Sequence, residues 1–89
     1  MPSKELTLIN KLGLHARAAA KFVNLASGFE SEVTISRNGK TVNGKSIMGV
    51  MMLAASCGTT IEVNASGNDA EQALQQIEQL VQDRFGEEA

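Results

Sequence analysis

The strand-like segments of this chain carry apolar residues on one face only, and this pattern restricts the possible folds more than any other feature. Alternation of apolar and polar residues predicts half-buried strands at residues 5–10, 31–36, 41–43 and 60–65. Sheets with one polar face are antiparallel, because parallel sheets are covered on both sides. The pattern therefore favours an α+β fold in which helices cover one face of a single antiparallel sheet.

Apolar residues at helical spacing predict three helices between and after these strands, at residues 16–27, 46–53 and 70–85. Gly28 fits the stop position of the first helix, and Ser46 is well placed to cap the second. The side chains expected to face the core are Ala19, Phe22, Val23 and Ala26, then Ile47, Val50, Leu53 and Ala54, then Ala70, Ala73, Leu74, Ile77, Leu80 and Val81.

Local turn signals support the same order of elements. Asn38-Gly39 is the strongest short signal for a β-hairpin. The segment 68–71 (Asn-Asp-Ala-Glu) resembles a capping box at the start of the last helix. The predicted order is β-α-β-β-α-β-α, with four strands and three helices, and 89 residues make one domain, residues 1–89.

Composition excludes several classes of function. A net charge of -2 and the absence of Trp and Tyr argue against nucleic-acid binding. The longest apolar run, residues 47–55, is too short to span a membrane, and residues 1–5 lack a signal-peptide pattern, so we expect a cytoplasmic protein. Cys57 is predicted to be a small buried residue, and one His with one Cys cannot build a metal site, so no metal is expected.

The segment 13–17 (Gly-Leu-His-Ala-Arg) concentrates the chemistry of the chain. His15 is the only histidine and lies where the first helix should open, two residues before Arg17. A neutral imidazole is a good nucleophile near pH 7. The unpaired N–H groups of the first helical turn, at Ala16, Arg17 and Ala18, and the Arg17 charge form a cradle for phosphate. We predict a shallow, exposed site in which His15 carries a phosphoryl group.

A second pattern points to a different function, a nucleotide hydrolase. Residues 39–46 match the phosphate-binding loop Gly-x4-Gly-Lys-Ser letter for letter. That motif needs a strand, a flexible loop and a helix within a parallel sheet. Here the first glycine belongs to the Asn-Gly turn, and residues 41–43 form a predicted strand inside the would-be loop. We therefore reject nucleotide hydrolysis, an interpretation that tight ATP binding would overturn.

Segment 13–17, together with residues 44–49 (Gly-Lys-Ser-Ile-Met-Gly), resembles the HPr family, the histidine-containing phosphocarriers of the bacterial phosphotransferase system. The similarity extends over residues 4–85. It implies an open-faced β-sandwich, with three helices on one face of a four-stranded antiparallel sheet. It also implies that Nδ1 of His15 accepts a phosphoryl group from phosphorylated enzyme I, which takes it from phosphoenolpyruvate. Transfer then goes to a histidine of an enzyme IIA-type protein, and Arg17 helps to hold the phosphoryl group.

Such a protein is a carrier more than an enzyme, needs no cofactor, and works in sugar uptake or in a related regulatory branch. This sequence departs from the family at Ala18, where the usual residue is proline. Alanine restores an N–H that could contact the phosphate, and it loosens the loop at a cost of up to about 1 kcal/mol.

The resemblance also implies a partner surface and a regulatory residue. The helix that begins after Ser46 contacts enzyme I and enzyme IIA in the family, which implies docking roles for Ile47, Met48, Met51 and Met52. The methionines could also serve as loose packing. Ala20, Lys21 and Asn24 are expected at the rim, and a monomer suits a carrier that docks two partners by one face. Ser46 matches a serine that a dedicated kinase phosphorylates in many bacteria and that a phosphorylase dephosphorylates. The alternative function is therefore a regulatory binding module that signals through Ser46.

Overall fold

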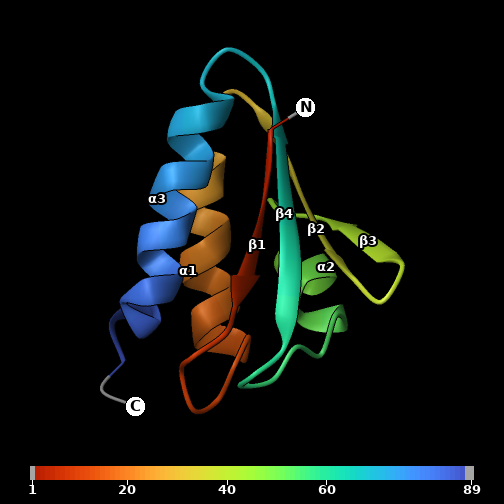
Figure 1. Cartoon of the computed structure of the whole chain (residues 1–89), viewed down its shortest axis with the longest axis vertical. Helices are drawn as coiled ribbons and strands as arrows, with labels where there is room; N and C mark the ends of the chain where they lie inside the picture. Colours follow the sequence, from red (N-terminus) through yellow and green to blue (C-terminus); the bar gives the residue numbers. More distant parts are fainter. Residues whose placement is uncertain (1, 88–89) are drawn as a thin grey trace.

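The computed structural model describes residues 2–87 and contains one four-stranded sheet with helices packed on one of its faces (Figure 1). The strands are β1 (Ser3–Thr7), β2 (Glu32–Arg37), β3 (Lys40–Asn43) and β4 (Thr60–Ser66). The helices are α1 (Ala16–Ser27), α2 (Ile47–Met52) and α3 (Ala70–Gln82), followed by the 3-10 turn η1 (Arg84–Gly86).

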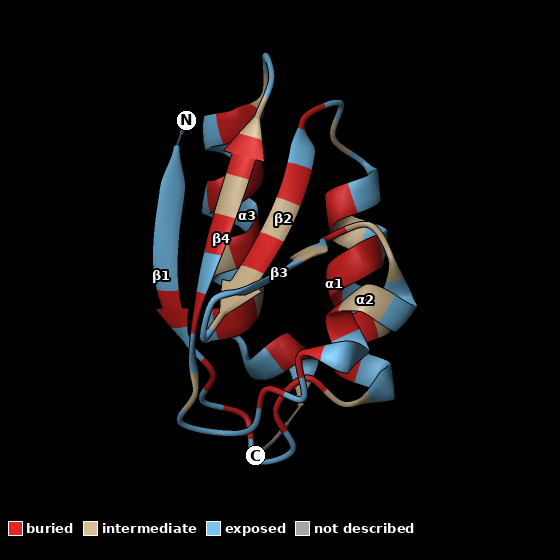
Figure 2. Ribbon diagram, turned by 90° about the vertical axis from the view of Figure 1, so that its right-hand side faces the viewer, coloured by how far each residue is buried: buried red, intermediate tan, exposed pale blue. Residues whose placement is uncertain are grey.

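The sheet is antiparallel throughout, with strand order β1-β4-β2-β3. Glu5 pairs with Glu62 across β1 and β4, and Ile35 pairs with Val63 across β2 and β4. Because successive side chains alternate between faces, this register puts every apolar strand residue on the helix-covered side. Figure 2 shows the alternation along β2 and β4. The α+β open-faced sandwich predicted from the sequence is confirmed.

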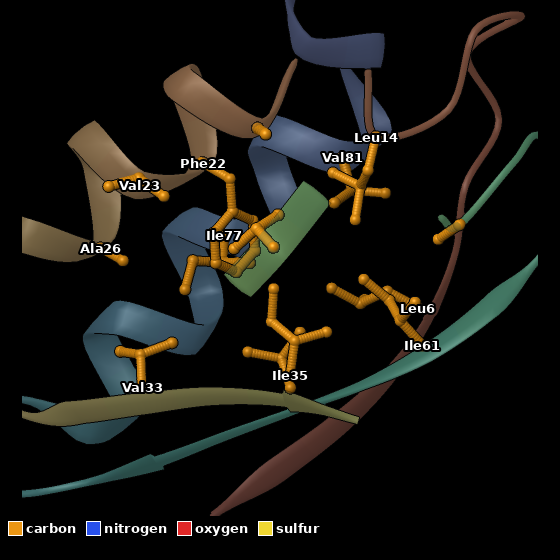
Figure 3. Packing of buried hydrophobic residues seen from close by; sticks show 14 of the residues in the cluster. Leu6, Leu14, Phe22, Val23, Ala26, Val33, Ile35, Ile61, Ile77 and Val81 are labelled. Atoms are coloured by element: carbon orange, nitrogen blue, oxygen red, sulfur yellow. The ribbon is translucent and has the colours of Figure 1, made fainter. Parts of the chain in front are cut away.

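The core lies between the sheet and the two long helices. Phe22 of α1 and Ile77 of α3 are fully buried and lie beside each other above Val33 and Ile35 of β2 (Figure 3). The inward-facing residues predicted for α1 are all buried, and so are those of α3 except Leu80, which is partly buried against the cluster. This packing fixes α1, and therefore its first residue, relative to the sheet.

One turn and one helix cap match their sequence signals. Asn38 and Gly39 have φ values of 51° and 80°, as the tight β2–β3 hairpin turn requires. Lys40–Asn43 is a strand, so residues 39–46 do not have the loop geometry of a nucleotide hydrolase. Ser46 caps α2, since its Oγ accepts the Gly49 N–H at 3.1 Å.

Several local predictions are wrong. Ile47 and Ala54 are exposed, because α2 has only six residues and presents Val50 and Leu53 to the core, while Ala54 (φ 51°) turns the chain away after the helix. Cys57 is exposed as well. Gly28 does end α1, but in a right-handed conformation (φ -75°) that other residues could adopt.

The capping box predicted at residues 68–71 is absent. Asp69, rather than Asn68, precedes α3, and its side chain makes no capping hydrogen bond. The Asp69 carboxylate instead accepts the N–H groups of Glu30 (2.9 Å) and Ser31 (3.0 Å) and the Ser31 hydroxyl. These bonds hold the pKa of Asp69 below its ordinary value of 3.8, with the Ser31 hydroxyl contributing most. The carboxylate therefore ties the start of α3 to the turn before β2.

Candidate functional site

His15 is the N-cap of α1, at the end of the molecule where the loop after β1 enters the helix (Figure 1). Its backbone is extended (φ -73°, ψ 178°), and its Nδ1 accepts the Arg17 N–H at 3.3 Å. The imidazole thus serves as the N-cap acceptor, a role that a Ser or Asp side chain has at most helix starts. The side chain is 26% exposed, so the ring is partly accessible to solvent at the helix N-terminus.

The backbone before His15 is held by close packing against the segment that follows α2. Gly13 has φ 61°, and a Cβ at this position would lie 2.4 Å from the Ala55 carbonyl oxygen. Leu14 is buried, and its N–H donates to the same oxygen at 2.9 Å. Gly13 is required here both for its conformation and for this close approach. The loop therefore presents His15 from a fixed backbone.

The other ring nitrogen of His15 contacts a residue that sequence analysis missed. Nε2 pairs with a carboxylate oxygen of Glu87, whose side chain is 13% exposed. The second Glu87 oxygen accepts the Asn10 side-chain amide at 2.9 Å, and the same amide donates to the Gly13 carbonyl at 2.8 Å. Asn10 is fully buried, and its Oδ1 has no hydrogen-bond partner among residues 2–87. The imidazole is thus held at both nitrogens.

The environment keeps the Glu87 carboxylate ionised. The hydrogen bond from Asn10 lowers the pKa of Glu87 below its ordinary value of 4.5, and the hydrogen bond and charge of His15 and the charge of Arg17 add to this effect. Partial burial opposes it. At neutral pH a negative charge therefore lies against Nε2, and the Arg17 guanidinium is close enough to act on the same carboxylate.

A tight turn brings Glu87 to the site. Arg84, Phe85 and Gly86 all have left-handed backbone, with φ values of 55°, 55° and 77°. Phe85 is 1% exposed and anchors the turn in the core, and Lys21 of α1 donates to its carbonyl oxygen at 2.6 Å. The turn therefore directs the chain after α3 back toward His15.

The remaining residues of the predicted phosphate cradle form the first turn of α1. Ala16 and Arg17 are exposed, and Ala18 is fully buried. No ion pair of Arg17 occurs among residues 2–87, so its guanidinium is available to an incoming anion. The Arg17 N–H is already used by the imidazole, which occupies part of the helix N-terminus that phosphate oxygens were expected to fill.

The apolar docking residues predicted on α2 are all exposed. Met48 is 73% exposed and Met52 60%, and Ile47 and Met51 are exposed to a lesser degree. Ile9 and Leu12 are exposed in the same way, and the sequence analysis did not single them out. On α1, Asn24 is exposed and Ala20 is half-buried, whereas the Lys21 ammonium is committed to the Phe85 carbonyl.

No group of three or more His, Cys, Asp or Glu residues that could hold a metal ion occurs in the described part of the chain. Across residues 2–87, every helix is too short or too polar to cross a bilayer.

Comparison with known proteins defines the class to which this fold and this site belong. A family model described as the PTS HPr component phosphorylation site matches residues 2–83. The phosphocarrier protein HPr of Cupriavidus necator is 52% identical over 87 residues, which cover 98% of each chain. The chain belongs to the HPr family of phosphocarrier proteins of the phosphotransferase system.

Solved structures agree with this assignment. The crystal structure of HPr-C-His from Thermoanaerobacter tengcongensis has a TM-score of 0.96 and 43% identity, and the match covers 100% of each chain. A crystal structure described as an HPr dimer from the same organism has a TM-score of 0.79 and 42% identity, covering 98% of this chain and 100% of that one.

Proposed function

We propose that this protein accepts a phosphoryl group on Nδ1 of His15 from phosphorylated enzyme I and passes it to a histidine of an enzyme IIA-type protein. One observation carries the proposal: the only histidine of the chain caps a helix through Nδ1 and reaches solvent. That geometry directs the nucleophilic lone pair at a group of backbone N–H donors, where a phosphoryl group would be held after transfer.

The chemistry needs positioning and charge neutralisation rather than covalent help from the protein. In an in-line transfer between two histidines, the phosphoryl oxygens carry the charge that the site must offset. The Arg17 N–H already lies 3.3 Å from Nδ1, and the Arg17 guanidinium with the N–H groups of Ala16 and Ala18, from the same first turn, are the further donors that would hold the phosphoryl oxygens. When Nδ1 takes the phosphoryl group, the Arg17 N–H loses the imidazole lone pair as its acceptor, and a phosphoryl oxygen can replace it.

The exposed apolar residues of α2 and the loop before His15 supply the surface on which both partners dock. Methionine side chains adapt to differently shaped partners, which suits a carrier with a donor and an acceptor. Met48 and Met52 are the most exposed residues of α2, which packs against the helix that His15 caps. One chain with one such face is sufficient for the relay, and sedimentation analysis would show whether this protein is a monomer or a dimer.

Ser46 supports a second, regulatory role. Its hydroxyl caps α2, the helix that carries the exposed methionines. Phosphorylation would add a charge of about -2 at this helix and disfavour an acidic partner surface. If the protein is only a regulatory module that signals through Ser46, its function survives loss of His15.

The test is phosphoryl transfer from labelled phosphoenolpyruvate and enzyme I, followed by addition of an enzyme IIA-type acceptor. His15→Asn is the appropriate variant, because asparagine keeps an N-cap acceptor while removing the nucleophile. We expect about one labelled phosphate per wild-type chain, loss of label on addition of the acceptor, and none on His15→Asn. Labelling of the variant, or a wild type that takes no label, would refute the proposal.

A further inference from the structure

The two contacts of the His15 ring define where its proton lies. A backbone N–H can only donate, so Nδ1, which faces the Arg17 N–H, is the unprotonated nitrogen. Nε2 therefore carries the proton of the neutral ring and donates it to the Glu87 carboxylate. A carboxylate that holds the far nitrogen of a reacting histidine in this way fixes both the tautomer and the orientation of the ring.

We propose that Glu87 is a positioning residue for phosphoryl transfer at His15: its carboxylate keeps the proton on Nε2 and balances the positive charge that the ring acquires when Nδ1 is phosphorylated. This inference rests on the proposed function. It assigns a chemical role to the chain after α3, a segment in which sequence analysis found no functional residue.

The charge of the His15 ring changes during transfer, and the Glu87 carboxylate acts on that change. The Nδ1 lone pair of neutral His15 forms the new N–P bond, while the N–P bond of the donor phosphohistidine breaks and its electron pair returns to the donor ring. The proton on Nε2 does not move. His15 thus passes from a neutral imidazole to an N-phosphorylated imidazolium, and the donor ring undergoes the reverse change. A fixed negative charge against Nε2 stabilises the product more than the reactant.

The structure holds the carboxylate in place independently of the ring. Buried Asn10 donates to one of its oxygens, and Phe85 with the Lys21 hydrogen bond anchors the turn that precedes it. Besides Asn10, the groups that act on Glu87 are His15 and Arg17, and both favour its ionised form. Because Glu87 lies on the Nε2 side, it leaves Nδ1 to the helix N-terminus and does not occupy the position of the incoming phosphorus.

The contact also permits the opposite role, a plug that covers the histidine until a partner displaces it. The two roles predict rate changes of opposite sign. A positioning carboxylate makes transfer faster, so its removal slows transfer. A plug makes transfer slower, so its removal speeds transfer.

The experiment uses the full chain with Glu87→Gln and Glu87→Ala, and Glu32→Gln as a control with the same change in charge. Glu32 is exposed on β2, on the sheet face away from the helices. Ring 15N chemical shifts report which ring nitrogen carries the proton. Stopped-flow transfer from phosphorylated enzyme I gives kcat and KM separately, and urea unfolding shows whether each variant is folded.

We expect Glu87→Gln to lower kcat roughly five- to tenfold, because a charged acceptor becomes neutral and its single oxygen can no longer accept from both Nε2 and the Asn10 amide. Glu87→Ala should lower kcat further and raise the fraction of ring with its proton on Nδ1. KM should change little in both, and Glu32→Gln should match the wild type. A purely structural residue would change the unfolding curve without changing the tautomer.

Faster transfer in either Glu87 variant would establish the plug and overturn the positioning role. Unchanged kcat and tautomer in both variants would also overturn it. If the wild type itself takes no label, the proposed function fails, and the ring 15N spectra then decide by themselves whether Glu87 sets the tautomer. Label on the wild type with no effect of Glu87 overturns this inference and leaves the proposed function standing.

Discussion

Replacing Gly13 by alanine tests whether close packing holds the backbone that presents His15. Gly13 has φ 61°, and the new Cβ would lie 2.4 Å from the Ala55 carbonyl oxygen and 2.7 Å from Ser56 Cα. Both are backbone atoms, which cannot turn aside as a side chain can. The loop and the segment after α2 must therefore separate for the variant to fold.

The magnitude follows from two separable costs. A left-handed conformation costs a non-glycine residue about 1–2 kcal/mol, and forcing an extra carbon into a packed site costs about 1–3 kcal/mol. Gly13→Ala incurs both, so we expect it to lower the free energy of unfolding by about 2–5 kcal/mol. Gly39 is the matched control, since it has φ 80° and no atom within 4 Å of an added Cβ. Gly39→Ala should incur only the first cost.

Urea unfolding of the two variants and the wild type measures the difference, which we expect to be about 1–3 kcal/mol. The rate of phosphoryl acceptance should fall in Gly13→Ala and stay unchanged in Gly39→Ala, because only the first disturbs the loop before His15. Free energies of unfolding that agree within about 0.5 kcal/mol would refute the packing argument, since additive independent costs are reproducible to that level.

Three further predictions concern the cap, the acidic groups and the docking surface. Ser46→Ala should lower the free energy of unfolding by about 1 kcal/mol, because the α2 cap is lost. Ser46→Asp keeps a capping oxygen, so its free energy of unfolding should fall less. Equal decreases in urea titrations would show that the cap contributes nothing. The pKa values of Asp69 and Glu87 are lowered by folding, so the stability they contribute is present above their ordinary values of 3.8 and 4.5 and is lost as pH falls through the lower folded values. Thermal unfolding between pH 7 and pH 2 should show a smaller loss below pH 3.8 in Asp69→Asn than in the wild type, and parallel curves would contradict the assignment. Met48→Glu should raise the KM for enzyme I several-fold while the free energy of unfolding stays within about 0.5 kcal/mol; an unchanged KM would remove α2 from the docking surface.

The elements that could be predicted from the sequence are those defined by local signals. Helix α1 begins and ends where the residues around His15 and Gly28 predict, and the β2–β3 hairpin follows from Asn38-Gly39 alone. The one-sided alternation of the strands predicts the layer arrangement, because a sheet with one apolar face must be covered on that face. In these regions neighbours in the sequence determine the conformation.

Predictions failed where a distant partner competes with a local signal. Asp69 would be expected to belong to a capping box, yet its carboxylate binds the backbone of Glu30 and Ser31, 39 and 38 residues earlier in the chain. Ile47 fits a helical apolar face, but α2 is too short to bury it. Hydrophobic periodicity could not have indicated either outcome.

In the candidate site, too, the residues set by local sequence were predicted and the one brought in from a distant segment was not. His15, Arg17 and the helix amides come from one short segment and were predicted together. Glu87 is separated from His15 by 72 positions, and it reaches the ring only because Phe85 is buried and the η1 turn is left-handed. One weak signal existed, since an aromatic residue followed by glycine at the end of α3 indicates an anchored turn. It does not indicate where the next carboxylate points.

The central claim is that one nitrogen of one ring carries the phosphoryl group. The most direct measurement is NMR of 15N-histidine-labelled protein after incubation with enzyme I and phosphoenolpyruvate, in which the nitrogen coupled to 31P is identified. We predict a single phosphohistidine signal, with the phosphorus bonded to Nδ1 of His15 and the proton retained on Nε2. Phosphorus bonded to Nε2, or phosphate found on any other residue, would contradict the account.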